Sequence, residues 1–292
     1  MPSPMMLNAN RGHSVPGGAA AGRLAPGPAI SQSGRIAVSG LTKTYERIVG
    51  RQLARTYALH DINFSVEAHE FVSIIGPSGC GKSTVMKLIA GLLPATQGEV
   101  QVSGSVVTGP GPDRACVFQF PGLMPWKTVV QNVDLALEFN GVAKAERAER
   151  ARRYVELVAL TEFRDHYPAE LSGGMQQRVG LARALAVEPA VLLMDEPFGA
   201  LDALTRTHMQ DELLRIWEAT KKTVVFITHS IEEAVVLSDR VLVMGNGTMA
   251  REVPIDLPRP RSRDALLADP RTLELMRELE RLLGDAHDGP EV

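Results

Sequence analysis

The sequence predicts an α/β fold with buried parallel strands, and three observations indicate it. Compact apolar runs of the length expected for buried strands occur at 71–75, 190–194 and 223–227. Stretches with helical periodicity separate these runs along the chain. The run at 71–75 leads into a glycine-rich turn and then into a helical stretch at 82–92. We therefore expect a parallel sheet covered by helices.

The composition is that of an ordinary globular protein, and it excludes several classes of function. Of 292 residues, 45% are hydrophobic and 22% are charged, which excludes a wholly disordered or fibrous chain. The 31 basic and 34 acidic residues give a net charge of -3, unlike a strongly basic nucleic-acid-binding protein. Two cysteines cannot form a disulfide framework. The longest unbroken apolar run, 190–194, is far shorter than the roughly 20 residues that cross a bilayer.

Three further segments complete the predicted organisation. Residues 1–34 hold six glycines and five prolines but no acidic residue, so we expect a disordered tail rich in Gly, Pro and Ala. A charged stretch at 143–160 places apolar residues on one side of a predicted helix. The stretch at 272–283 repeats this pattern near the C-terminus. We expect a helical insertion into the α/β domain and a short helical extension after it.

The most informative stretch is a glycine-rich loop at 76–84. It matches the pattern G-x-x-x-x-G-K-[ST] and lies between a predicted strand and a predicted helix, as this motif requires. The glycines let backbone N–H groups point at phosphate oxygens, and the helix dipole favours the same anion. Lys82 is expected to reach the β- and γ-phosphates, and the Ser83 hydroxyl is suited to bind Mg²⁺. The residues expected to contact the nucleotide are Gly76, Pro77, Ser78, Gly79, Cys80, Gly81, Lys82, Ser83 and Thr84.

Two acidic residues end another predicted strand, at 191–194. Asp195 and Glu196 follow this apolar run directly. Taken alone, such a pair is usually a solvated strand end, but a phosphate-binding loop upstream gives it a chemical use. Asp195 is expected to hold Mg²⁺, and Glu196 is expected to polarise the attacking water as a general base.

Cys80 lies inside the predicted phosphate loop. Its position beside a helix N-terminus and near Lys82 favours a thiolate, whereas the alternative is a small side chain that fills space. We therefore expect that a maleimide reagent modifies Cys80, and that ATP protects the thiol.

Further motifs give the chain a family resemblance. The sequence Leu-Ser-Gly-Gly-Met-Gln-Gln-Arg at 171–178 resembles the signature motif of ABC-type ATPases, the motor subunits of ABC transporters. Gln119 matches the lid glutamine of that family, Asp202 its D-loop aspartate and His229 its switch histidine. Tyr45 stands where the family usually stacks an aromatic ring on adenine, with Tyr57 as an alternative.

The resemblance implies a P-loop NTPase fold with a RecA-like core, a mixed sheet, an antiparallel β subdomain and a helical signature subdomain. We expect the ATPase domain at 35–255, with the helical subdomain at about 121–180, and a helical extension at 256–292. The connection between Tyr45 and Tyr57 carries a row of arginines, which we interpret as a solvated loop or a turn of helix.

The resemblance also implies the site. ATP and Mg²⁺ are the expected cofactors, Glu196, His229 and Gln119 the catalytic residues, and Ser83, Gln119 and Asp195 the metal ligands. The residues Ser172, Gly173 and Gly174 open a predicted helix and so form a second anion-binding helix start. In the family, a head-to-tail homodimer closes this signature over the ATP that the other subunit holds.

The biological role implied is that of a bacterial importer subunit. The stretches at 168–178 and 256–261 are similar to those of the nitrate, sulfonate and taurine importer branch, and the roughly 40 residues after the domain are too few for a further regulatory domain. Expected partners are a membrane permease and, indirectly, a periplasmic or lipid-anchored solute-binding protein, at the cytoplasmic face of the membrane. No nucleic acid is expected. The alternative is a soluble ABC ATPase that acts on DNA or ribosomes; a P-loop kinase would leave 171–178 unexplained.

Overall fold

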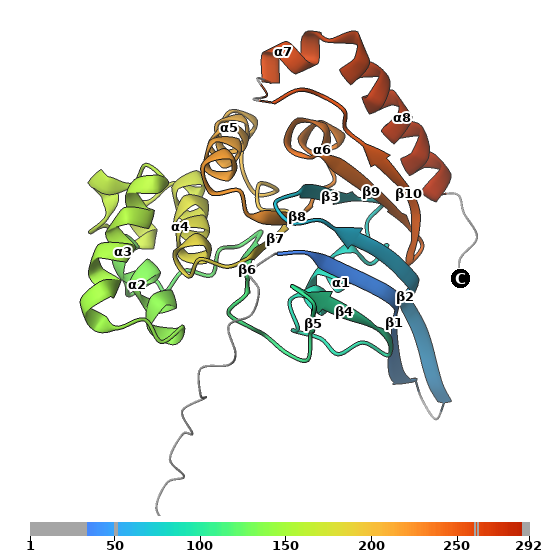
Figure 1. Ribbon diagram of the computed structural model, residues 1–292, viewed down its shortest axis with the longest axis horizontal. Helices are drawn as coiled ribbons and strands as arrows, with labels where there is room; N and C mark the ends of the chain where they lie inside the picture. Colours follow the sequence, from blue (N-terminus) through green and yellow to red (C-terminus); the bar gives the residue numbers. More distant parts are fainter. Residues whose placement is uncertain (1–33, 50–51, 260, 262, 288–292) are drawn as a thin grey trace, which may run out of the picture. The chain divides into compact units, whose positions relative to one another are not determined.

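The computed structural model describes residues 34–49, 52–259, 261 and 263–287. Two sheets and the helices that pack on them make up the described fold (Figure 1). The tail predicted at 1–34 lies outside the described residues except for Gly34, whose backbone N–H donates a hydrogen bond to Ser103 Oγ at 3.1 Å. Among the described residues, no helix is both long enough and apolar enough to span a membrane.

A six-stranded sheet forms the centre of the fold. Its strand order is β10-β9-β3-β8-β7-β6, and every neighbouring pair is parallel except β10 with β9. The predicted α/β class with a mixed sheet is therefore confirmed. The strands of this sheet are β3 (Phe71–Ile75), β6 (Arg114–Phe118), β7 (Val191–Asp195), β8 (Thr223–Ile227), β9 (Arg240–Gly245) and β10 (Thr248–Pro254).

Side chains of the central strands alternate between two hydrophobic clusters. Phe71 and Ile75 of β3 belong to a cluster with residues of the helices α2 to α6, whereas Val72 and Ile74 belong to a cluster with α1 and the second sheet. All five residues of β3 and all five of β8 are buried. Burial on both faces explains why these strands are mostly apolar, without the alternation of a half-exposed strand. The helices are α1 (Lys82–Ile89), α2 (Val129–Phe139), α3 (Lys144–Leu157), α4 (Gly173–Ala186), α5 (Ala203–Thr220) and α6 (Ile231–Leu237).

The second sheet is antiparallel, with the order β2-β1-β4-β5. Its inward residues, such as Ile36, Leu41 and Leu59, share one cluster with α1 and with the central sheet. The helix that follows the predicted phosphate loop is therefore packed between two sheets, which fixes its position. The strands are β1 (Ile36–Val49), β2 (Gln52–Val66), β4 (Gln97–Val102) and β5 (Ser105–Val106).

The described part of the arginine-rich connection, 46–49 and 52–56, is strand, so its interpretation as a loop or a turn of helix is wrong there. β1 and β2 form a long antiparallel pair, and their register continues as far as Val49, which pairs with Gln52. Cross-strand pairing supports this extension; Arg55 Nε, for example, lies 2.9 Å from Glu46 Oε1 on the facing strand. Charged side chains that point into water on an edge hairpin remove the apolar alternation by which a strand is usually identified.

The helices α2, α3 and α4 pack against one another beside the central sheet (Figure 1). A reciprocal cap starts α2: Gln131 N–H donates to Thr128 Oγ1 at 3.4 Å, and Thr128 N–H donates to Gln131 Oε1 at 3.0 Å. The buried Asn132 accepts a hydrogen bond from Met124 N–H at 2.8 Å. The loop after Gln119 is thereby tied to α2. The helix α4 continues to Ala186, beyond the end proposed for the helical subdomain.

The C-terminal segment packs back onto the central sheet. Its helices are α7 (Arg263–Ala268) and α8 (Pro270–His287), and α8 contacts β9 and α6. Leu279 of α8 is fully buried in the cluster of the larger helices. The Arg259 guanidinium lies 4.2 Å from the centre of the Trp217 ring and forms an ion pair with Asp239 at 2.8 Å. These contacts join the extension to the core.

Candidate nucleotide site

The loop at 76–84 connects β3 to α1 as a tight glycine-rich turn. Gly79 and Gly81 have φ angles of +82° and +103°, which residues with a side chain rarely adopt. At Gly76 a Cβ atom would lie 2.4 Å from Met244 O, so the backbone there has no room for a side chain. This turn brings all the predicted loop residues to the start of α1, where backbone N–H groups and the helix dipole favour an anion.

Lys82 folds back over its own loop. Its Nζ donates hydrogen bonds to Gly76 O and to Pro77 O, each at 2.8 Å, and the residue is buried. The ammonium group therefore lies at the mouth of the turn formed by the loop, held by these two carbonyls and by the Cys80 sulfur at 3.8 Å. A phosphate group that enters the turn meets this positive charge directly.

Ser83 and Asp195 lie together although 112 residues separate them in the sequence. Ser83 Oγ donates a hydrogen bond to Asp195 Oδ1 at 3.0 Å. Burial raises the pKa of the Asp195 carboxyl above its usual value, and the hydrogen bond from Ser83 opposes this shift. A hydroxyl and a partly desolvated carboxylate are the oxygen ligands that Mg²⁺ prefers, so these two residues fit the predicted metal site.

Gln119 follows β6, whose Phe118 pairs with Asp195 in the sheet. Its amide lies against Gly199, because a Cβ atom on Gly199 would be 3.0 Å from Gln119 Nε2. Gln177 on α4 donates from Nε2 to Gln119 O at 2.6 Å. Sequence reasoning missed Gln177, which connects the helix of the signature motif to the backbone of the lid glutamine.

Glu196 and His229 face each other beyond the ends of β7 and β8. His229 Nδ1 lies 3.3 Å from Glu196 Oε2. Glu196 has a φ of +45°, and its backbone N–H donates to Ile227 O at 2.9 Å. A strained backbone at a candidate catalytic residue is typical of functional sites.

One cavity joins these groups. Its volume is about 310 Å³, and the phosphate loop, Glu196 and His229 line it. The structure thus brings together a phosphate-binding turn, a candidate general base and a candidate switch histidine. The lining residues are Ser78, Gly79, Gly81, Lys82, Ser83, Thr84, Glu196 and His229.

The signature residues are not part of that cavity lining. Ser172 caps α4, with Met175 N–H donating to Ser172 Oγ at 3.3 Å, and both Ser172 and Gly173 are exposed. Gly174 packs against α5, where an added Cβ would lie 2.5 Å from Thr205 Cγ2. Asp202 caps α5 by accepting a hydrogen bond from Thr205 N–H at 3.0 Å, and this bond lowers the pKa of the Asp202 carboxyl.

The two candidate adenine platforms lie on opposite faces of the β1–β2 hairpin. Tyr57 pairs with Thr44, the residue next to Tyr45, so the two rings point in opposite directions. Both are exposed, at 44% for Tyr45 and 51% for Tyr57. Lys43 Nζ lies 5.3 Å from the centre of the Tyr45 ring. An adenine ring on one face of the hairpin can therefore stack on only one of the two tyrosines. Neither tyrosine lines the phosphate cavity.

The thiolate expected at Cys80 is wrong. The side chain is buried, and burial raises the pKa of the thiol above its usual value, although Lys82 opposes the shift. Cys116 is also expected to be a protonated thiol at neutral pH, because burial raises its pKa to about 11. A helix start and a nearby lysine favour the thiolate only where water or donors replace the lost hydration.

We expect both thiols of the native protein to react slowly with a maleimide at pH 7. A raised pKa leaves less thiolate at neutral pH than a free cysteine has, so the rate should increase as pH rises. Mass spectrometry of labelled peptides over time measures each site, with urea-unfolded protein as the fully reactive control. Rapid labelling of Cys80 that ATP prevents would contradict the burial described above.

Comparisons with known proteins agree with this geometry. A model of the ABC transporter family matches residues 59–199. The chain is 48% identical over 238 residues to the taurine import ATP-binding protein of Rhizobium johnstonii, covering 80% of this chain and 91% of that protein. It is 46% identical over 228 residues to the nitrate import ATP-binding protein of Synechococcus elongatus, covering 76% and 82%.

Among solved structures, a dimeric ATP-binding cassette bound to ADP and Pi in a post-hydrolysis state superposes with a TM-score of 0.66. Its sequence identity is 35%, and the match covers 76% of this chain and all of that chain. The predicted P-loop NTPase fold and the predicted family are therefore confirmed. These matches show that the chain belongs to the ATP-binding proteins of the ABC transporter family.

Proposed function

We propose that this protein is the ATP-hydrolysing motor subunit of a bacterial ABC importer. The observation that carries the proposal is the cavity that joins the phosphate loop to Glu196 and His229. Relatives named for taurine and nitrate import support a small anionic solute, or one that contains sulfur or nitrogen, of the nitrate, sulfonate or taurine type. Contacts that select the solute would lie in the partner proteins.

The active form would be a head-to-tail homodimer. Within one chain, Ser172 and Gly173 are exposed and stand apart from the phosphate cavity, so the second anion-binding helix start has no nucleotide of its own. In the homodimer, the signature of each chain covers the ATP that the other chain holds. The dimeric state of a structurally similar cassette supports this arrangement.

Each residue then has a role in hydrolysis. Lys82 holds the β- and γ-phosphates, and Ser83, Asp195 and Gln119 would hold Mg²⁺, which neutralises phosphate charge when it is bound with ATP. Glu196 accepts a proton from the attacking water, and His229, 3.3 Å from it, stabilises the charge on the γ-phosphate. Ser172 of the second copy contacts the same phosphate. Tyr45 is the proposed adenine platform.

The permease would dock on the helical region. Phe120 and Trp126 are 74% and 70% exposed, so the loop after Gln119 presents large apolar side chains to solvent. Asn132, at the start of α2, ties this loop to the helix by its bond to Met124. Movement of a partner on this loop is therefore carried to both Gln119 and α2.

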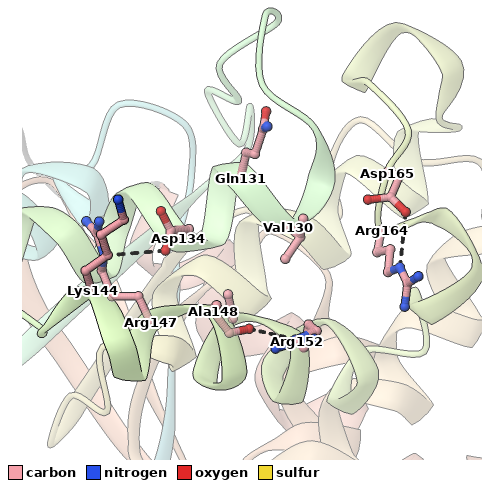
Figure 2. A pocket seen from close by; sticks show the side chains of 10 residues that line it. Val130, Gln131, Asp134, Lys144, Arg147, Ala148, Arg152, Arg164 and Asp165 are labelled. Atoms are coloured by element: carbon pink, nitrogen blue, oxygen red, sulfur yellow. Dashed lines mark hydrogen bonds and ion pairs between the residues drawn. The ribbon is translucent and has the colours of Figure 1, made fainter.

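We extend the proposed docking surface to a cavity of about 550 Å³ that residues of α2 and α3 line (Figure 2). Its lining contains the apolar residues Val130, Ala148 and Ala151 together with four basic and two acidic side chains, which we call the charged rim. Arg147 forms an ion pair with Glu138 at 3.1 Å. Arg152 Nε donates to Ala148 O at 3.0 Å, and no ion pair joins Arg152 to an acidic residue among the described residues, so its guanidinium can pair with an acidic group on the docking segment. The charged rim residues are Lys144, Arg147, Arg152, Arg164, Asp134 and Asp165.

This assignment places the protein on the cytoplasmic face of the membrane as a peripheral subunit. The permease supplies the spans, and a periplasmic or lipid-anchored binding protein delivers the solute to it. The proposal involves no nucleic acid.

We expect Glu196→Gln to lower the rate of ATP hydrolysis by about 10²–10⁴-fold, the range that a general base contributes. ATP binding should persist, because Lys82 and the loop are unchanged. Steady-state hydrolysis and nucleotide-binding titrations measure the two effects. The matched control is Glu274→Gln, an exposed glutamate on α8 that should hydrolyse ATP normally. Normal turnover in Glu196→Gln would remove Glu196 from the mechanism.

Purification of the tagged protein from gently solubilised native membranes tests the importer assignment. A permease should be recovered with it, and Arg152→Glu should reduce that recovery by reversing a charge at the docking rim. Arg153→Glu is the control, since Arg153 is the exposed neighbour on α3 and does not line the cavity. Recovery of ribosomal or DNA-repair proteins in place of a permease would keep the ATPase but overturn the transport role.

A further inference from the structure

One buried carboxylate has no role in the hydrolysis described above. Glu233 lies in the first turn of α6, and only 6% of it is exposed. A buried acidic group is costly unless hydrogen bonds satisfy it, and both oxygens of Glu233 have a donor. The position of those two donors is what connects Glu233 to the nucleotide site.

The first donor is the residue before His229. Thr228 Oγ1 donates to Glu233 Oε2, and the same hydroxyl oxygen accepts a hydrogen bond from Ser230 N–H at 3.0 Å. The hydroxyl thereby fixes the backbone on both sides of His229. Ser230 also caps α6, with Glu233 N–H donating to Ser230 Oγ at 3.3 Å. The His229 side chain is exposed and lies 3.3 Å from Glu196, so Thr228 and Ser230 fix the backbone from which the imidazole reaches Glu196.

The second donor is on another helix. Gln210 Nε2 on α5 donates to Glu233 Oε1 at 3.0 Å, and Gln210 is also buried. The helix α5 begins at Asp202, the D-loop aspartate. Glu233 thus connects the segment that carries His229 to the helix that starts at the D-loop.

The far end of α6 is also held. Arg261 Nη1 donates to Val235 O at 3.2 Å and to Val236 O at 3.3 Å, in the last turn of α6. A helix held at both ends has little freedom to rotate. The carboxylate of Glu233 therefore has a fixed position from which to orient Thr228.

We propose that Glu233 is a positioning residue for His229, acting through the Thr228 hydroxyl, with Gln210 as its anchor on α5. The inference rests on the proposed function, in which His229 stabilises the γ-phosphate. Glu233 touches neither the nucleotide nor the water; it sets the direction of the imidazole and relates that direction to the D-loop helix.

Two substitutions test the inference without changing the shape of the site. Thr228→Val and Glu233→Gln should each lower kcat by about tenfold, the scale of one charged hydrogen bond, and leave KM for ATP unchanged because the phosphate loop is intact. Thr228→Ser keeps the hydroxyl and should restore kcat. Glu232→Gln is the matched control: it is the adjacent carboxylate on α6, has an ion pair of its own and makes no bond to Thr228.

The same substitutions are then combined with His229→Ala. If Glu233 acts through His229, neither Thr228→Val nor Glu233→Gln lowers kcat further in that background. An additive loss, a raised KM, or a loss that Thr228→Ser does not restore would show a general structural role and overturn the inference. If His229→Ala is slow but both substitutions are normal, only the inference fails. A normal rate in His229→Ala itself would remove the proposed role of His229, and the positioning role with it.

Discussion

The register of the parallel strands determines where the chemistry occurs. Ile74 of β3 pairs with Ile227 of β8, and Ile227 pairs with Asp195 of β7. Because parallel strands end at the same edge, the phosphate loop, the acidic pair and Thr228 with His229 all begin within one or two residues of this line. The hydrogen bond of 3.0 Å between Ser83 and Asp195 connects the phosphate loop after β3 to the end of β7, although β8 lies between these two strands. Without this alignment, the motifs would not meet at one site.

The second constraint is that, within one chain, the signature residues do not line the phosphate cavity. The helix α4 starts with exposed signature residues and, further along, Gln177 holds the backbone of Gln119 at 2.6 Å. A contact made by the start of α4 with a second copy is therefore connected mechanically to the lid glutamine and to the apolar loop after it. The arrangement gives a physical basis for the proposed link between ATP binding, dimer closure and the membrane partner.

Local patterns predicted most of the fold and of the site. The loop at 76–84 and the acids after β7 follow directly from their flanking strands, because residue type and chain direction there are set within a few positions. The hairpin at β1–β2 was not predicted, because its charged residues face water and only cross-strand pairing defines it. Burial of Cys80 was missed for a similar reason: packing against distant segments, not neighbours in sequence, decides its pKa. The bonds of Glu233 to Thr228 and Gln210 depend on the packing of α5 against α6, which no sequence spacing encodes.

We infer that two copies of this chain share each ATP. The most direct measurement is the solution mass of Glu196→Gln by light scattering, with and without ATP, since slow hydrolysis preserves the bound nucleotide. We expect ATP to double the mass. Adding Ser172→Arg, which places a bulky charge at the signature, should return the mass to that of one chain while ATP still binds. A Glu196→Gln protein that binds ATP and stays monomeric would contradict the shared site.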